Sequence, residues 1–235
     1  MPPAPDDAAR PEISTATRER LLCVAERLFA EHGYASVSVR RITTAAGCNL
    51  AAVNYHFGGK LGLYREAFQR RLAIMRDRRI AAVRRLTEDP DPGLTVEHVL
   101  RTFAEAFLEP FVAESEGRLV LSLISREMVD PQLPPELFWL EMAEPVRRAL
   151  AAALAPVAPK VEPRALELCI ESLVAQLTHA MTLQRLPRSA TAPADLPFLE
   201  EVTEHIVRFT AAGIRGIADQ TRSRRRRSTR AAGAP

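Results

Sequence analysis

The sequence predicts an all-α protein, with a three-helix head that contains a helix-turn-helix, a longer helical body, and about nine helices in all. Gly is scarce at 10 of 235 residues, whereas the helix-favouring residues Ala, Leu, Glu and Arg are abundant. Apolar residues recur at the spacing of one helical face, and no segment alternates apolar and polar residues as a half-buried strand does. With 47% hydrophobic and 26% charged residues, the chain has the balance of a globular protein with a sizeable core.

The first helix is expected over residues 15–31, after a Pro-rich stretch, residues 1–13, that is expected to be disordered. Gly33 fits the position just past the helix end, where a left-handed backbone is favourable. The apolar side chains that would share one face of this helix are Leu21, Leu22, Ala25, Leu28 and Phe29.

Two short capped helices are expected next, with a Gly-containing turn between them. Ser38 is placed to cap the second helix, and Gly47 to end it after two turns. Asn49 is then placed to cap a third helix over residues 50–56. Two short capped helices joined in this way are typical of a helix-turn-helix.

A long helix is expected over residues 60–86, ending before the helix-breaking run at residues 88–93. Pro-rich breaks separate five further helices, expected over residues 95–113, 117–129, 135–155, 163–186 and 199–219. The chain is therefore divided into a disordered N-terminus (1–13), a helix-turn-helix domain (14–60), a helical body (61–220) and a disordered Arg-rich tail (221–235).

Charge is unevenly distributed along the chain. Residues 1–85 carry 15 Lys and Arg against 8 Asp and Glu, residues 86–220 carry 11 against 21, and residues 221–235 carry 6 Arg and no acid. A basic head on an acidic body indicates that the head faces a polyanion, although segregation of charge between helix surfaces by chance is the alternative. The Arg run would either add salt-sensitive phosphate binding or keep the protein soluble.

Several classes of protein are not expected. The three cysteines are far apart, with no Cys-x-x-Cys or Cys/His cluster, so neither a disulfide framework nor a metal site is supported, and no cofactor is predicted. There is no Gly-rich phosphate loop, nucleophile motif or paired carboxylates, so an enzyme is not expected. The first 11 residues contain no apolar run, and the longest apolar stretch, residues 149–159, is too short to span a membrane. A cytoplasmic protein without a membrane partner is the simplest interpretation.

Residues 18–68 carry three motifs in a fixed order. These are Ala25-x-x-Leu28-Phe29-Ala30-x-x-Gly33-Tyr34, then Val39-x-x-Ile42-x-x-x-Ala46-Gly47, and then Val53-Asn54-Tyr55-His56-Phe57-Gly58-Gly59-Lys60 with Leu63. Together they resemble the DNA-binding domain of the TetR/AcrR family. Two residues depart from the pattern: Asn54 stands where many members carry Tyr, and Thr43 where a small Ala is usual.

The body carries a weaker likeness. Arg126-Glu127-Met128, followed by Pro131 and Pro134-Pro135, with Asn49-Leu50-Ala51-Ala52 earlier, resembles the subgroup with a CecR-type C-terminal domain. The family resemblance implies a sequence-specific transcriptional regulator, a repressor that a small-molecule ligand releases from its operator. An activator of the same family and a less specific DNA-binding protein are the alternatives, and a pure protein-interaction module is disfavoured by the basic head.

The head is expected to contact double-stranded operator DNA in the major groove through the start of the third helix. Asn54 is the candidate for adenine readout, with a phosphate contact or a solvated side chain as alternatives. The family clamps phosphates where Tyr55 and His56 lie, and Lys60 opens the long helix, where free N–H groups also attract a phosphate. The full set of candidate contacts is Ser38, Arg40, Thr44, Asn49, Leu50, Ala51, Asn54, Tyr55, His56 and Lys60.

The body is expected to bind a ligand and to form a homodimer, because one head alone makes few contacts with DNA. The last two helices would form the dimer interface through Leu166, Ile170, Leu173, Leu177, Val202, Ile206 and Phe209, unless these faces close the core of one subunit. The candidate pocket residues, each with plain core as its alternative, are Phe103, Phe107, Arg126, Met128, Trp139, Met142, Gln176 and His179. A ligand would shift the population of head positions through the long helix.

Overall fold

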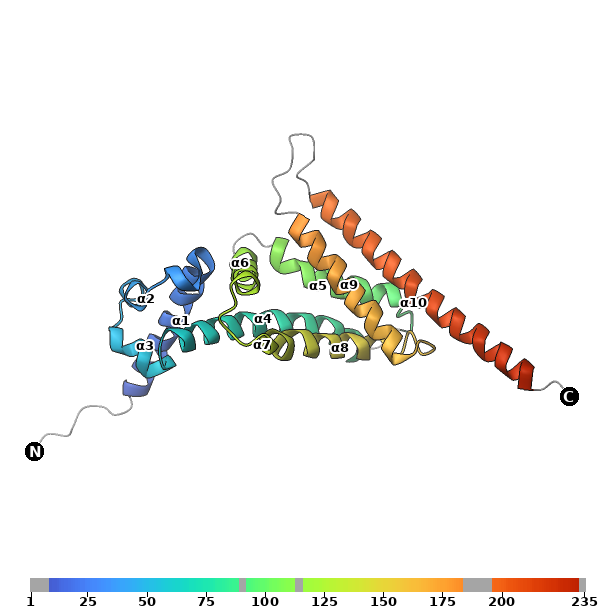
Figure 1. Cartoon of the computed structure of the whole chain (residues 1–235), viewed down its shortest axis with the longest axis horizontal. Coiled ribbons are helices and arrows are strands. Elements are labelled where there is room, and N and C mark those ends of the chain that lie inside the picture. Colours follow the sequence, from blue (N-terminus) through green and yellow to red (C-terminus); the bar gives the residue numbers. More distant parts are fainter. Residues whose placement is uncertain (1–8, 89–91, 113–115, 184–195, 233–235) are drawn as a thin grey trace, which may run out of the picture. The chain divides into compact units, whose positions relative to one another are not determined.

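The computed structural model describes residues 9–88, 92–112, 116–183 and 196–232, and every regular element in these residues is helical (Figure 1). The predicted all-α class is therefore confirmed. The elements are α1 (Ala9–Ser36), α2 (Val39–Ala46), α3 (Leu50–Phe57), α4 (Lys60–Glu88), α5 (Val96–Val112), α6 (Glu116–Val129), α7 (Glu136–Phe138), the π-helical turn η1 (Trp139–Ala143), α8 (Glu144–Leu154), α9 (Pro163–Leu183) and α10 (Leu196–Ala232). Within the described ranges, no helix is both long and apolar enough to cross a bilayer.

The chain forms two compact units that do not follow the expected division at residue 60. The first unit comprises residues 1–74 and 113–141, and the second comprises residues 75–112 and 142–235. One helix, α4, thus contributes residues to both units. The first unit also takes in α6 from far along the chain, because α6 packs against α1.

The predicted caps of the helix-turn-helix are confirmed. The Ser38 side chain accepts a hydrogen bond from the Arg41 backbone N–H at 3.1 Å, at the start of α2. The Asn49 side chain accepts one from the Ala51 N–H at 3.0 Å, at the start of α3. Each cap satisfies a backbone donor that the first turn of a helix leaves free, so both short helices begin where local sequence dictates.

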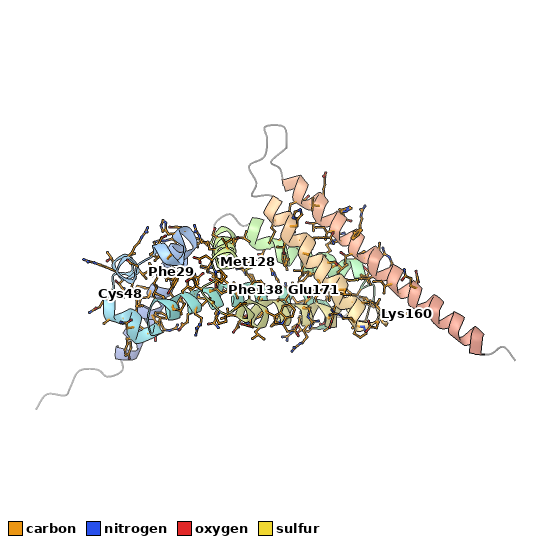
Figure 2. All side chains as sticks on the ribbon, in the orientation of Figure 1. Phe29, Cys48, Met128, Phe138, Lys160 and Glu171 are labelled. Atoms are coloured by element: carbon orange, nitrogen blue, oxygen red, sulfur yellow. The ribbon has the colours of Figure 1, made fainter. Side chains whose placement is uncertain are left out.

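The core of the first unit is built from apolar residues of α1 to α4. The fully buried side chains include Leu21, Phe29, Ile42, Val53, Leu63 and Leu72. Phe29 meets the Tyr64 ring edge-on, with ring centroids 5.0 Å apart, and it lies among the helices of this unit (Figure 2). The apolar positions predicted for one face of the first helix are therefore its core positions.

The end of α1 is interrupted at Gly33, whose φ of 78° and ψ of 164° are not helical. The positive φ agrees with the prediction, but the ψ differs from that of a left-handed helical residue. An L side chain at this φ would be strained, so Gly permits the sharp change of direction before α2.

The second unit packs the C-terminal part of α4 with α5, α8, α9 and α10. Figure 1 shows α9 and α10 side by side, and the two helices are in contact. The fully buried side chains of this unit include Val99, Leu100, Phe103, Leu150, Leu173 and Val207. Ion pairs join neighbouring helices at the surface, for example Arg147 of α8 with Glu167 of α9 at 2.8 Å.

Both ends of the described chain are more helical than expected. Residues 9–13, predicted as disordered, form the start of α1, since Pro11 is tolerated in a first turn whose N–H groups have no partner. The Arg-rich run, also predicted as disordered, continues α10 to Ala232. No Gly or Pro occurs between residues 217 and 232, and Arg has a high helix propensity. Residues 1–8 and 233–235 of these predicted segments lie outside the described residues.

The single helix expected over residues 135–155 is divided into α7, η1 and α8. Pro145 has no N–H to donate to the Glu141 carbonyl, so the regular α-helical ladder is interrupted at this point. The wider π-helical turn of Trp139–Ala143 directly precedes it.

Candidate nucleic-acid interface

The exposed face of α3 is the main candidate surface. The helix buries Val53 and Phe57 against the rest of the unit. The rest of its surface, from Leu50, 53% exposed, round to Tyr55, 80% exposed, is open to water. Large apolar and aromatic side chains gain nothing from contact with water, so a Leu and a Tyr on one exposed face indicate a surface that binds a partner.

Asn54 lies on this same exposed face of α3. It follows Leu50 by one helical turn, as Tyr55 follows Ala51, and all four residues are exposed. The structure therefore brings together the apolar and amide side chains that the sequence predicted for base contacts. His56 is half-buried, with its ring centroid 4.9 Å from that of Tyr55.

The polar residues of α2 and the two cap residues differ in how far they are open to a partner. Arg40 and Thr44 are exposed and open to a partner, as predicted. Arg41 lies 2.7 Å from the His32 ring through its guanidinium, so it has an intramolecular partner. Ser38 and Asn49 are exposed, but each uses its side-chain oxygen as a helix cap, which leaves only the Ser hydroxyl proton and the Asn amide N–H groups for a phosphate.

The Lys60 ammonium does not project freely into water at the start of α4. Its Nζ lies 4.1 Å from the centroid of the Tyr34 ring, a cation–π distance. Partial burial lowers the pKa of Lys60 below its ordinary value. A phosphate contact through Lys60 would therefore form over the face of Tyr34, a neighbour that the sequence did not predict.

The turn between α3 and α4 depends on a close backbone approach at Gly62. A Cβ atom placed there would lie 1.8 Å from the carbonyl oxygen of Phe57, the last residue of α3. Only Gly fits this position, and it sets the distance between α3 and α4. The role of Gly62 was not predicted, because a Gly inside a helical pattern gives no sign of what it contacts.

Arg126, predicted as a pocket residue, lines a cleft of about 410 Å³ in the first unit and also binds the end of α1. Its Nε donates to the Ala30 carbonyl at 3.0 Å, and its Nη2 donates to the Glu31 carbonyl at 2.7 Å. These carbonyls lie just before the interruption at Gly33, and carbonyls at a helix end commonly need partners from outside the helix. The guanidinium thus caps α1 from a helix that lies almost a hundred residues later.

The next residue, Glu127, accepts three hydrogen bonds. Its Oε2 accepts from the Tyr64 hydroxyl at 2.7 Å, and its Oε1 accepts from the backbone N–H groups of Gln132 and Leu133 at 2.8 and 2.7 Å. Burial and the hydrogen bond to Glu127 raise the pKa of Tyr64 far above its ordinary value, so the phenol stays a donor. Arg126 and Glu127 together fasten α6 to α1 and α4.

The other predicted pocket residues differ in their burial. Phe103, Phe107 and Met142 are buried core of the second unit. Met128 is 78% exposed, and Trp139 and His179 are also exposed. Gln176 is half-buried and donates to the Ser172 carbonyl of its own helix. Whether these residues bind a ligand stays a prediction, because periodicity identifies apolar positions without showing which of them surround a space.

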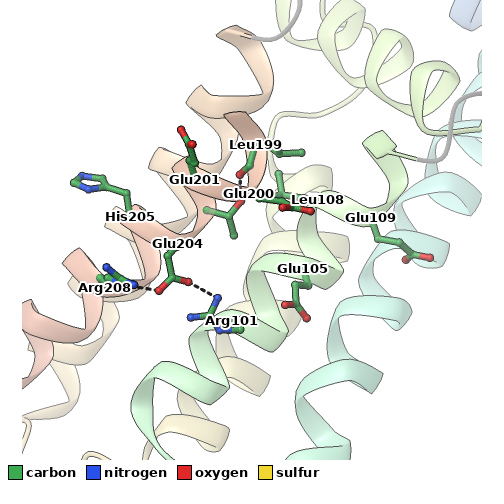
Figure 3. A pocket seen from close by; sticks show the side chains of 11 residues that line it. Arg101, Glu105, Leu108, Glu109, Leu199, Glu200, Glu201, Glu204, His205 and Arg208 are labelled. Atoms are coloured by element: carbon green, nitrogen blue, oxygen red, sulfur yellow. Dashed lines mark hydrogen bonds and ion pairs between the residues drawn. The ribbon is translucent and has the colours of Figure 1, made fainter. Parts of the chain in front are cut away.

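A cleft of about 850 Å³ lies between α5 and α10, and none of the predicted pocket residues lines it. Figure 3 shows Glu204 between Arg101 and Arg208, to which it is ion-paired, with Glu105 and Glu109 extending from α5. The lining also includes Glu200 and Glu201, so the cleft is strongly acidic.

The predicted dimer interface is mostly core of a single subunit. Leu166, Ile170, Leu173, Leu177 and Ile206 are buried, because α9 packs against α5, α8 and α10 of its own chain. Val202 is half-buried, and only Phe209, 62% exposed, is free for a partner. The outward face of α9 and α10 instead presents Leu168, Ala175, Phe209 and Ala212.

Two families match this chain in sequence. Residues 21–67 match the family described as "Bacterial regulatory proteins, tetR family", and residues 101–213 match "Tetracyclin repressor-like, C-terminal domain". The likeness of the body to a CecR-type domain stays a prediction.

Curated relatives of this chain are also transcriptional regulators. The HTH-type transcriptional repressor AcnR of Corynebacterium glutamicum is 38% identical over 82 residues, which is 33% of this chain and 44% of the relative. The HTH-type transcriptional regulator AcrR of Shigella flexneri is 32% identical over 108 residues, 46% of this chain and 47% of the relative. The matches thus span less than half the length of these relatives.

Solved structures show the same fold. A TetR-family regulator from Mesorhizobium loti superposes with a TM-score of 0.65 at 19% identity, over 85% of this chain and 96% of that one. A transcriptional regulator from Saccharomonospora viridis, solved in complex with choline, superposes with a TM-score of 0.62 at 19% identity, over 83% and 95%. These likenesses extend across both compact units of the chain.

Proposed function

Because the chain belongs to the TetR family of bacterial regulatory proteins, we propose that it is a transcriptional repressor that binds operator DNA through α2 and α3. The observation that carries this proposal is the exposed face of α3, with Leu50 and Tyr55 in water and Asn54 between them. The basic charge of residues 1–85 suits a polyanionic partner.

The α3 face suggests how bases and phosphates are divided among its residues. The Asn54 amide can bond the adenine edge bidentately, and Leu50 and Ala51 can contact thymine methyl groups. Tyr55 and Arg40 would bond phosphates and set the register of the head on the duplex. With a single amide for base readout, the shape and deformability of the operator would contribute to specificity.

A DNA-binding regulator acts where the chromosome lies, so we place the protein in the cytoplasm. We assign residues 14–60 to DNA binding and the helical body to dimerisation and to an effector that weakens operator binding. Differential affinity of the effector for two head positions is the energetic requirement for such release.

Replacing Tyr55 with Ala is expected to weaken operator binding about 10-fold or more, because a hydrogen bond to a charged phosphate is lost. Fluorescence anisotropy with duplexes from the region flanking its own gene, in excess competitor DNA and over a salt series, measures this change. Met128→Ala, at an equally exposed residue of α6, serves as the control and should bind like wild type.

Two outcomes of that measurement would contradict the proposal. Unchanged affinity of Tyr55→Ala would remove α3 from the interface. Complete loss of wild-type binding to every flanking duplex in competitor DNA would indicate a less specific DNA-binding protein.

Two half-sites on DNA require a homodimer, and we propose the outward face of α9 and α10 as its interface. Phe209→Glu should shift the dimer toward monomer, because a carboxylate would be buried without a partner in an apolar interface. Analytical ultracentrifugation at micromolar concentration measures the shift, with Lys160→Glu in the exposed α8–α9 loop as the control. A Phe209→Glu protein that stays dimeric would place the interface on another face.

A further inference from the structure

Arg79 of α4 is a buried cation in the second unit, with only 5% of its surface exposed. Its Nη2 donates to the Phe107 carbonyl over a long 3.4 Å, and its guanidinium carbon lies 3.6 Å from the centroid of the Phe107 ring. Its Nε is buried without any hydrogen-bond partner. Among the described residues, no carboxylate forms an ion pair with Arg79, and burial lowers its pKa to about 9.

Within the described ranges, the other buried charged residue has a different environment. Glu26, in the first unit, lies between Arg71 at 2.5 Å and Arg70 at 3.5 Å. An isolated charge in an apolar interior is costly, so buried charges are normally paired. A guanidinium remains protonated near neutral pH even with a lowered pKa, so Arg79 is a cation whose counter-ion is not supplied by the described chain.

We propose that Arg79 is the anion-binding residue of the effector site, and that the effector is an apolar organic molecule with one carboxylate or phosphate group. The planar guanidinium binds such oxyanions through two parallel hydrogen bonds, which would replace the one long bond to Phe107 and engage the unpartnered Nε. The interior of this unit suits an apolar body, because the buried residues of α5 and α8 are Val, Leu, Phe and Ala.

The acidic cleft between α5 and α10 is not expected to bind this anionic ligand. Its lining carries five Glu residues against Arg101 and Arg208, and both of those arginines are paired with Glu204. An anion would be repelled there, whereas Arg79 has no carboxylate to repel it.

The direct test measures binding by thermal unfolding and titration calorimetry of the full-length protein. The probes are decanoate, phenyl phosphate and the uncharged decanol, and the variants are Arg79→Met and Arg78→Met. Arg78 is the exposed neighbour on the same helix and so gives a matched control. Decanoate or phenyl phosphate is expected to raise the Tm of wild type and Arg78→Met by several degrees, and decanol is not. Arg79→Met should lose about 100-fold in anion affinity, the effect of removing a charged bidentate partner.

The response to one anion over the other distinguishes a carboxylate ligand from a phosphate ligand. Without ligand, Arg79→Met should be at least as stable as wild type, because an apolar side chain replaces an unpaired buried charge. Should Arg79→Met not fold by circular dichroism, Arg79→Lys keeps the charge without the fork and should bind the same anion more weakly.

The inference is overturned if neither anion raises the Tm of wild type, or if both variants respond equally. Its link to regulation rests on the proposed function, and operator binding is therefore measured in parallel. Wild type that binds operator DNA but no anion contradicts only the Arg79 site. Wild type that binds an anion through Arg79 but no DNA contradicts only the proposed regulator.

Discussion

Gly62→Ala is expected to abolish specific operator binding and to destabilise the first unit. The added Cβ would lie 1.8 Å from the carbonyl oxygen of Phe57, a backbone atom that cannot rotate away. The end of α3 or the start of α4 must move, and α3 carries the exposed Tyr55 that we assign to DNA. Overpacking of this kind costs about 1–3 kcal/mol, and often more against backbone.

The direction of the change in stability distinguishes a crowded Gly62 from an open one. Ala is favoured over Gly inside a helix by about 1 kcal/mol, so the same change at an open position would stabilise α4. Urea unfolding and operator anisotropy would measure both consequences. Leu61→Ala, at the exposed neighbouring residue, is the control and should bind operator normally. A Gly62→Ala protein that is more stable than wild type would refute the close approach.

Glu127→Gln is expected to release α6 from α1 and α4. Both carboxylate oxygens accept hydrogen bonds, from Tyr64 on one side and from the Gln132 and Leu133 N–H groups on the other. A Gln oxygen can accept from the two backbone N–H groups only if the Gln NH₂ group turns toward Tyr64, whose hydroxyl must then accept instead of donate. Every hydrogen bond to residue 127 then changes from a charge-assisted bond to a weaker neutral one. The expected loss is about 2 kcal/mol in the free energy of unfolding.

Chemical denaturation followed by tyrosine fluorescence, which reports on Tyr64 among others, measures this loss. Glu136→Gln on α7 makes the same chemical change at an exposed residue and should be neutral. Equal stability of the two variants would mean that the Glu127 contacts contribute nothing to the first unit.

Local signals predicted the head well. The caps at Ser38 and Asn49 and the short helices that they begin depend on residues within one turn, which the sequence displays directly. The exposed face of α3 followed from the same periodicity. Whether its residues contact DNA stays a prediction, and Lys60 illustrates the limit, because its partner Tyr34 is not adjacent in any pattern.

Contacts between distant segments were not predicted. Periodicity identified Leu166, Ile170 and Leu173 as an apolar face, but not that α5, α8 and α10 of the same chain cover it. The sequence does not distinguish the buried Arg79 from the other arginines of α4, because its burial depends on residues of other helices that pack around it. The Arg-rich run was predicted as disordered from its composition, but it is helical, as the high helix propensity of Arg favours.

The cap that Arg126 places on the end of α1 has a consequence for biosynthesis. The residues it joins are separated by 95 and 96 positions, so α1 to α3 leave the ribosome long before their capping residue exists. Until α6 emerges, the carbonyls of Ala30 and Glu31 and the face of α1 that packs against α6 remain in water. The part of the protein that we propose binds DNA, although encoded first, therefore completes its native structure only after more than half of the chain has been translated.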